Sequence, residues 1–154
     1  MWKSFNHFYP SLIYQGQRIF LKEKYHLKAD DTYDHVEVIV YSIHLMDNHH
    51  KIGEIDLRLT MNEFMYYYGH LGYHIIEKYR GNHYAAEACT IIKLIAKEKY
   101  AMKELIVTCN PDNYASIKTI ERIGGIFVEH VTVPKDHELY HLGDKEKFIY
   151  RIKL

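Results

Sequence analysis

The sequence predicts an α+β domain built on a mixed, mostly antiparallel sheet of about seven strands, with helices on both faces. Three observations support this prediction. Several segments alternate between apolar and polar residues or are rich in β-branched residues, as strands are. One long segment has apolar residues at the three- and four-residue spacing of a helix face. A short apolar run follows it, and such a central strand–helix–strand unit indicates a parallel pair with a right-handed crossover.

Four strands are expected before the long helix. Residues 18–27 and 36–46 form the first two, and a turn at residues 47–50 leads to a third strand over residues 51–60. Residues 69–77 form the fourth. The third strand alternates between apolar and charged positions, with Ile55, Leu57 and Leu59 on one face and Glu54, Asp56 and Arg58 on the other. The second and third strands therefore read as a hairpin.

The long helix is expected over residues 84–100, because its apolar residues fall on one face. These residues are Ala85, Ala88, Cys89, Ile92, Ile95 and Ala96. The continuous apolar run at residues 104–109 is typical of a strand inside a sheet. A second helix is expected from the N-cap residue Asn113 to about residue 123, where Gly124 and Gly125 stop it.

Two more strands, at residues 126–133 and 147–153, complete the sheet, and a polar loop at residues 134–146 joins them. We see no linker or repeat, so residues 1–154 form a single domain whose residues 1–17 are an N-terminal extension.

Composition excludes several function classes. Lys plus Arg (20) equals Asp plus Glu (20), and a net charge of zero argues against general attraction to nucleic acid or membrane surfaces. The chain has no apolar run of membrane-spanning length and no signal-peptide core at its start. Its two cysteines make no disulfide framework. We therefore expect a cytoplasmic protein with buried thiols.

The segment from Tyr79 to Ala88 carries the main functional signal. It joins the fourth strand to the long helix through Gly81. The first N–H groups of a helix have no partner within the helix, and with the helix dipole they form a site for phosphate. Such a site indicates a cofactor that carries phosphates.

On these residues the chain resembles the GNAT superfamily of acyl-CoA N-acetyltransferases. The family motif, (Arg/Gln)-x-x-Gly-x-(Gly/Ala), is similar to Arg80-Gly81-Asn82-His83-Tyr84-Ala85, and Asn113…Ser116…Gly124-Gly125 is similar to the family's second conserved helix. Gly53-Glu54-Ile55-Asp56-Leu57-Arg58 and Gly69-His70-Leu71-Gly72-Tyr73 are similar to motifs of uncharacterised bacterial acetyltransferases. The resemblance implies a GNAT-type sheet with its acyl-CoA-binding core at residues 69–125.

Two departures from the family pattern matter. His83 stands where the motif has its first Gly, and we expect it to present its N–H from a right-handed helical conformation and to touch a phosphate. The segment at residues 28–34 is too short for the two helices that the family places after its first strand. The extension at residues 1–17 or a second subunit would then cover the acceptor side, and a homodimer is one such arrangement.

The resemblance implies acetyl transfer to a primary amine of a small molecule or peptide, by direct attack in a ternary complex. The implied residues that bind acetyl-CoA, used as a co-substrate, are Ile75, Ile76, Glu77, Arg80, Gly81, Asn82, His83, Tyr84, Ala85, Asn113 and Ser116. The alternative is a catalytically weak CoA-binding or regulatory module of the same fold, and a third reading is a structural dimerisation domain.

The catalytic base is expected to be His70 or Glu54, with Asp56 as an alternative on the same face as Glu54. The position of the family's tyrosine acid holds Ile120, so the thiolate would leave with help from water or another tyrosine.

Three further features have open readings. The histidines His44, His49 and His50 read as a surface turn, and no metal is expected. Cys109 reads as a core residue or an acetylated nucleophile. The aromatic segment at residues 61–68 reads as packing, as a dimer contact or as a wall of the acceptor pocket.

Overall fold

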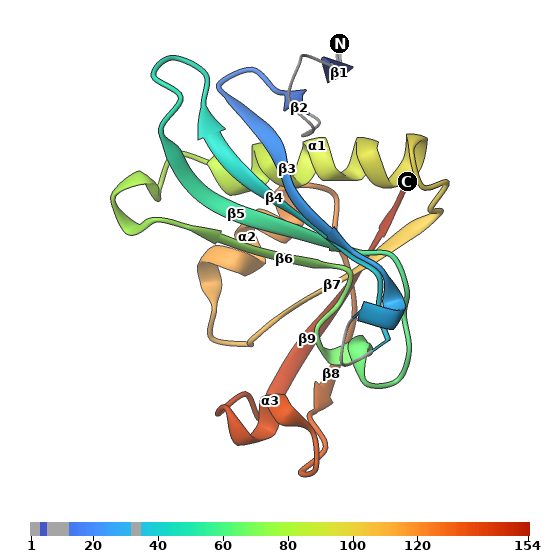
Figure 1. The fold of residues 1–154 in the computed structure, drawn as a ribbon. Coiled ribbons are helices and arrows are strands. Elements are labelled where there is room, and N and C mark those ends of the chain that lie inside the picture. Colours follow the sequence, from blue (N-terminus) through green and yellow to red (C-terminus); the bar gives the residue numbers. More distant parts are fainter. Residues whose placement is uncertain (1–3, 6–12, 32–34) are drawn as a thin grey trace.

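The computed structural model describes residues 4–5, 13–31 and 35–154, and in it the chain folds around two antiparallel sheets (Figure 1). The first sheet has the order β1-β2-β3-β4-β5-β6. Its strands are β1 (Ser4–Phe5), β2 (Ile13–Gln15), β3 (Ile19–Leu27), β4 (Val38–Leu45), β5 (Lys51–Arg58) and β6 (Leu71–Ile75). The second sheet has the order β7-β9-β8, with β7 (Glu104–Cys109), β8 (Ile126–Thr132) and β9 (Glu146–Lys153).

The helices connect and cover these sheets. The α-helices are α1 (Tyr84–Glu98), α2 (Tyr114–Arg122) and α3 (Glu138–His141), and the 3-10 helices are η1 (Ala29–Asp31), η2 (Met65–Tyr67) and η3 (Glu77–Tyr79). None of the helices in the described part of the chain is long and apolar enough to cross a membrane.

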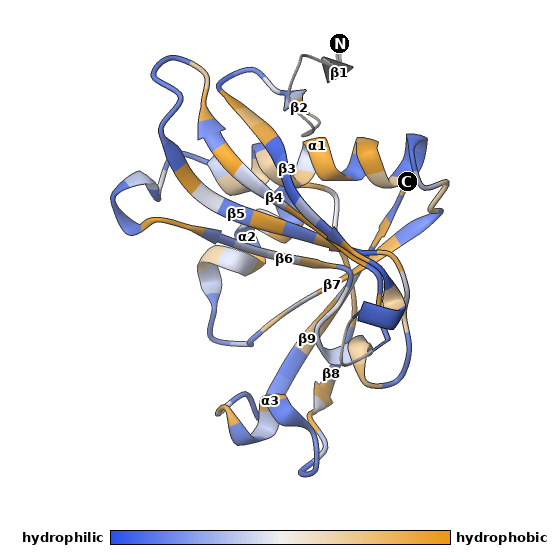
Figure 2. Cartoon of the chain, in the orientation of Figure 1, coloured by the Kyte–Doolittle hydropathy of each residue, from blue (hydrophilic) through white to orange (hydrophobic). Residues whose placement is uncertain are grey.

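The core forms where α1 packs on the first sheet. The predicted apolar face of α1 is buried at Ala88, Cys89, Ile92, Ile95 and Ala96. The alternation of β5 is confirmed, because Ile55 and Leu57 are buried while the charged residues of the other face are partly exposed. Figure 2 shows this alternation as bands along β5. Burial of these apolar side chains is the main favourable term in folding.

The α+β class and the mostly antiparallel pairing are confirmed. Among the described residues, the seven strands from β3 to β9 each have five residues or more, and β7 has the predicted bounds. The short strands β1 and β2 were not predicted. The antiparallel pair β2–β3 adds residues of the predicted extension to the first sheet, while residues 1–3 and 6–12 lie outside the described residues.

The predicted parallel pair on either side of α1 forms no ladder. One isolated bridge, between Gly69 and Val107, joins the two sheets. From there β6 and β7 diverge, and α2 lies between them in Figure 1. The polar loop at residues 134–146 is not wholly irregular, because it contains α3 and the buried residues His137 and Leu139. The divergence of β6 and β7 is the feature that positions the candidate site.

Candidate active site

A cavity of about 480 Å³, here named the basic cavity, lies between the end of β6, the start of α1 and one face of α2. Its lining residues are Tyr73, His74, Ile75, Tyr79, Arg80, Gly81, His83, Tyr84, Ala85, Asn113, Ala115, Ser116, Lys118, Thr119 and Arg122. Three of them, Arg80, Lys118 and Arg122, carry permanent positive charge, and none is Asp or Glu. Such a lining attracts a polyanion.

The loop before α1 presents backbone donors to this cavity. Gly81 and His83 have φ values of 79° and 62°, both in the left-handed region. The N-cap residue His83 makes no side-chain cap, so it leaves the first-turn N–H groups of Tyr84 and Ala85 without one. The expectation of a right-handed helical conformation at His83 is wrong. The turn imposes the conformation that the motif glycine adopts without strain.

Arg80 and Asn82 brace this loop. Arg80 Nε donates to the Ile75 carbonyl oxygen at 2.8 Å, and Asn82 Nδ2 donates to the carbonyl oxygens of Tyr79 and Arg80 at 3.0 and 3.1 Å. Most of the residues predicted to bind the coenzyme line the basic cavity. The exceptions are Ile76, Glu77 and Asn82. The Ile76 amide donates to Ile52 O at 2.8 Å instead, within the sheet.

Asn113 caps α2, as predicted. Its side chain accepts a hydrogen bond from the Ser116 backbone N–H at 3.1 Å. This contact fixes the first turn of α2. Lys118 and Arg122 follow on the cavity side of the helix, at a spacing of four residues. The sequence prediction missed both cations, although their spacing from Ala115 and Thr119 places all four on one helix face.

A second cavity of about 340 Å³, here named the inner cavity, adjoins the basic cavity. It is lined by Arg58, Tyr67, Tyr68, Leu71, Gly72, Tyr73, Thr108, Cys109, Asn110, Asn113, Ser116, Leu139, Asp144 and Lys147. Tyr73, Asn113 and Ser116 line both cavities. A ligand that follows the basic cavity past these three residues therefore reaches the inner one.

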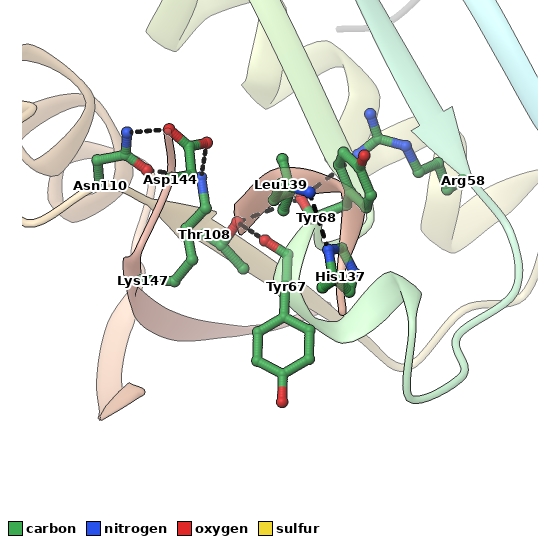
Figure 3. Close-up of polar contacts among 9 residues, drawn as sticks. All are labelled: Arg58, Tyr67, Tyr68, Thr108, Asn110, His137, Leu139, Asp144 and Lys147. Atoms are coloured by element: carbon green, nitrogen blue, oxygen red, sulfur yellow. Dashed lines mark hydrogen bonds and ion pairs between the residues drawn. The ribbon is translucent and has the colours of Figure 1, made fainter. Parts of the chain in front are cut away.

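One wall of the inner cavity is a fully paired polar network (Figure 3). Buried Lys147 donates to Asn110 Oδ1 at 2.6 Å and to Asp144 Oδ2 at 2.8 Å, and Asn110 Nδ2 donates to Asp144 Oδ1 at 2.8 Å. Burial alone would raise the pKa of Asp144, but the hydrogen bonds from Lys147 and Asn110 hold that pKa below its usual range. The network ties the loop before β9 to the end of β7.

The opposite wall centres on Arg58. Its Nη1 donates to Gly69 O at 3.0 Å, and its Nη2 lies 2.9 Å from Asp56 Oδ2. A Cβ added at Gly72 would lie 2.6 Å from Asp56 Oδ1, so this carboxylate lies against the backbone of the cavity wall. Burial raises the pKa of Asp56, and the Arg58 charge opposes that shift.

Neither predicted base lines either cavity. The buried ring of His70 accepts a hydrogen bond at Nδ1 from the Ile106 N–H, and burial lowers its pKa. The Glu54 carboxylate accepts hydrogen bonds from Lys24 and Lys51, which hold its pKa below the usual range. Their catalytic roles stay predictions.

Tyr73 is the functional candidate that the sequence did not single out. Its hydroxyl oxygen is buried beside the Ser116 and Thr119 side chains, and it makes no well-formed hydrogen bond among the described residues. Burial raises the pKa of Tyr73 to about 12, and the side chains of Ser116 and Thr119 act in the opposite direction. The sequence does not show that this tyrosine in β6 has a buried hydroxyl, because that burial depends on where α2 packs.

The structure places the three features whose role the sequence left open as follows. Cys109 is buried and lines the inner cavity, and burial raises its thiol pKa to about 11. Tyr67 and Tyr68 of the aromatic segment line the same cavity. His44 is hydrogen-bonded through Nδ1 to the His49 carbonyl and through Nε2 to Ser42. No group of three His, Cys, Asp or Glu side chains suited to a metal occurs within the described ranges.

Two diverging sheets, a basic cavity at a helix N-terminus and an adjoining inner cavity together form a site suited to a ligand that carries phosphates. The family model described as the acetyltransferase (GNAT) domain matches residues 4–126. This chain therefore belongs to the GNAT acetyltransferase family.

Solved structures share the fold. An acetyltransferase of the GNAT family from Bacillus anthracis is 19% identical, with a TM-score of 0.60 over 74% of this chain and 65% of that one. An acetyltransferase from Agrobacterium tumefaciens is 26% identical, with a TM-score of 0.58 over 75% and 60% of the two chains. Mycobacterium smegmatis RimJ in complex with CoA-disulfide is 13% identical, with a TM-score of 0.59 over 75% and 53%. This chain thus spans less than two thirds of these proteins. No curated protein matches it in a sequence search.

Proposed function

We propose that this chain transfers an acetyl group from acetyl-CoA to a primary amine of a small molecule or peptide, by direct attack in a ternary complex. The observation that carries the proposal is the continuity of the two cavities. The basic cavity has the charge and the helix N-terminus that a diphosphate needs, and it meets the inner cavity at Tyr73, Asn113 and Ser116.

The coenzyme would lie along the basic cavity. The N–H groups from Gly81 to Ala85 would hold the pyrophosphate, and Lys118 and Arg122 would add charge from α2. The backbone of β6 near Ile75 would bind the pantetheine arm, and the thioester would reach the junction of the two cavities. The CoA-disulfide in the Mycobacterium smegmatis structure, which shares this fold, supports a coenzyme of this chemistry.

The amine would attack the thioester carbonyl carbon from the inner cavity. The ammonium first gives one proton to a base, and the neutral amine then attacks. The N–C bond forms and the C–S bond breaks, and the second proton lost from nitrogen balances the one that the thiolate takes up from its donor. We place the base on Asp56, which itself lines neither cavity, because its carboxylate lies against Gly72 of the inner cavity and burial raises its pKa. His70 and Glu54 remain the other candidates. Neutral variants of the three, Asp56→Asn, His70→Asn and Glu54→Gln, compare them directly in kcat.

Tyr73 is the proposed proton donor for the leaving thiolate. Of the described tyrosines that line the basic cavity or the inner cavity, Tyr73 is the one that lines both. Its pKa is raised by burial, so the hydroxyl keeps its proton near neutral pH. Tyr73, with Ser116 beside it, would then replace the tyrosine acid of the family, whose position holds Ile120 in this chain.

Calorimetric titration with acetyl-CoA tests the coenzyme part. Ala85→Glu places a carboxylate in the basic cavity and should weaken binding at least about tenfold, because like charges in a partly enclosed site repel. Thr90→Glu, at an exposed position on the same helix, is the matched control and should bind as the parent does. Equal binding by the parent and by Ala85→Glu, with both folded by circular dichroism, would contradict the proposal.

Thiol release over a panel of amines tests catalysis. Turnover on at least one amine supports the transferase. Tight coenzyme binding without turnover on any amine would favour the alternative, a CoA-binding module of the same fold. A cytoplasmic location and a homodimer stay predictions.

A further inference from the structure

A third cavity, of about 590 Å³, lies outside the inner cavity and is here named the aromatic cavity. It is lined by Met61, Asn62, Glu63, Phe64, Tyr66, Tyr67, Pro134, Asp136 and His137. Tyr67 lines both the aromatic cavity and the inner cavity. Tyr67 therefore belongs to the lining of both the proposed acceptor site and this outer site.

The aromatic rings of this cavity are held in place by contacts of their own. Tyr66 and Tyr67 stand nearly perpendicular, at 81°, with ring centroids 5.8 Å apart. The Tyr66 hydroxyl donates to Glu129 Oε1 at 2.5 Å, and the Phe64 ring stacks on His137 with centroids 4.3 Å apart. Rings fixed in this way lose little conformational freedom when a ligand binds.

The charges of the lining have one sign. Glu63 and Asp136 are exposed carboxylates at this cavity, and no Lys or Arg is among its lining residues. Glu63 and Asp136 form no ion pair within the described part of the chain. The field inside the cavity therefore favours a cation.

His137, which also lines the cavity, is hydrogen-bonded at both ring nitrogens. Its Nδ1 accepts from the Leu139 backbone N–H at 3.1 Å, so that nitrogen carries no proton. Its Nε2 lies 2.8 Å from the Phe64 carbonyl oxygen, so that nitrogen is the one that donates. The Nδ1 contact is the N-cap of α3.

We propose that the aromatic cavity binds an ammonium group. Tyrosine and phenylalanine faces attract cations through the ring quadrupole, and the two carboxylates add attraction from the rim. Tyr67 lines both this cavity and the proposed acceptor site, so the preferred acceptor carries a second positive charge beyond its reacting amine. This inference about the acceptor rests on the proposed function. Diamines and peptides with a cationic side chain near the N-terminus belong to this class.

Binding is tested without the coenzyme, so that it does not depend on catalysis. Choline is the probe, and dimethylbutanol, its neutral isostere with carbon in place of nitrogen, is the matched control ligand. Nuclear magnetic resonance of isotope-labelled methionine methyl groups reports the site, since Met61 lines the cavity while Met102 does not. We expect choline to shift the Met61 signal saturably, with little effect of the isostere and no shift at Met102.

The charge contribution is tested by the double variant Glu63→Gln, Asp136→Asn. It should bind choline at least about threefold more weakly, whereas Asp47→Asn, at a remote exposed turn, should leave binding unchanged. Equal binding of choline and the isostere, or no saturable shift at Met61, would overturn the proposal. So would an unchanged choline affinity in the double variant.

The acceptor class is tested with putrescine and n-butylamine, which differ by one amine group. The parent should favour putrescine in kcat/KM, and the double variant should lose most of that preference while it keeps its rate on n-butylamine. A putrescine preference that survives in the double variant would overturn the link to the acceptor. An absence of turnover on every amine would instead count against the proposed function, while the choline titration still decides the ammonium site.

Discussion

The side chain of His70 accepts a hydrogen bond from the backbone N–H of Ile106 at 2.8 Å, and the backbone N–H of His70 donates to the Ile106 carbonyl oxygen at 2.7 Å. One residue thus pairs both backbone groups of its partner, at the point where β6 and β7 begin to diverge. The imidazole replaces the ladder that the sheets do not form, and it satisfies a buried N–H that would otherwise be costly.

This relationship predicts a loss of stability in acid. Burial lowers the pKa of His70 in the folded state, so below the ordinary histidine pKa of about 6.5 the unfolded chain takes up a proton that the folded one resists. The free energy of unfolding should therefore be constant with respect to His70 above that pH and should fall as the pH drops below it. Urea denaturation from about pH 8 to about pH 5 measures the slope.

The His70→Asn variant isolates this group from the other histidines. Its Oδ1 can accept the Ile106 hydrogen bond but does not titrate, so the slope should be smaller than in the parent. An unchanged slope would show that His70 is not the titrating group. The same variant tests catalysis, because a loss of kcat without a loss of stability would support His70 as the base.

Replacing His83 by glycine should stabilise the folded protein. A left-handed conformation costs a residue with a Cβ about 1–2 kcal/mol, part of which is offset by the greater freedom of glycine when unfolded. We expect His83→Gly to raise the free energy of unfolding by up to about 1 kcal/mol and to bind acetyl-CoA at least as well as the parent.

Ala101→Gly is the control for His83→Gly. Ala101 also has a positive φ, of 52°, but it does not line the basic cavity. It should gain stability and leave coenzyme affinity unchanged. A weaker affinity in His83→Gly alone would mean that the His83 side chain itself contacts a phosphate.

The hydroxyl of Tyr73 should matter for rate and not for folding. Its oxygen is buried and makes no well-formed hydrogen bond among the described residues, so Tyr73→Phe should leave stability unchanged or slightly higher. If the hydroxyl donates a proton to the leaving thiolate, kcat should fall by about 10²-fold while the Kd for acetyl-CoA stays the same. An unchanged kcat in a chemistry-limited assay would remove Tyr73 from the mechanism.

Loss of the Lys147 side chain should destabilise the protein, because Lys147 pairs with Asn110 and Asp144 in the wall of the inner cavity. Replacing it by Met leaves the Asp144 carboxylate with one fewer partner and the Asn110 oxygen without its donor. Loss of one member of a buried pair costs about 3–5 kcal/mol, and the partial exposure of Asp144 reduces this to about 2–3 kcal/mol. The midpoint of urea unfolding measures it.

Lys145→Met is the matched control for this prediction. Lys145 is exposed, and its Nζ donates to the Tyr140 carbonyl at 2.9 Å and lies 3.4 Å from the Tyr140 ring centroid. Its loss should cost no more than about 1 kcal/mol. Similar losses in the two variants would contradict the special role of the buried network.

Local patterns were enough to predict most of the elements. The bounds of β7, the cap of α2 by Asn113 and the stop at Gly124 follow from an apolar run, an N-cap side chain and a glycine that can adopt a positive φ. Each depends on residues adjacent in sequence. The loop from Arg80 to Ala85 belongs with them, because its glycine and the helix that follows already indicate a phosphate site.

Tertiary packing alone decided how the two sheets meet and which side chains share a cavity. Tyr73 faces α2 only because β6 and β7 diverge, and His137 joins the aromatic segment to α3 across 73 residues of sequence. Asn110, Asp144 and Lys147 likewise come from separate segments. Periodicity reports which face of one element is apolar, but it carries no information about which other element that face meets. The proposed amide donors for the coenzyme therefore follow from local sequence, whereas the proposed acceptor side depends on long-range contacts.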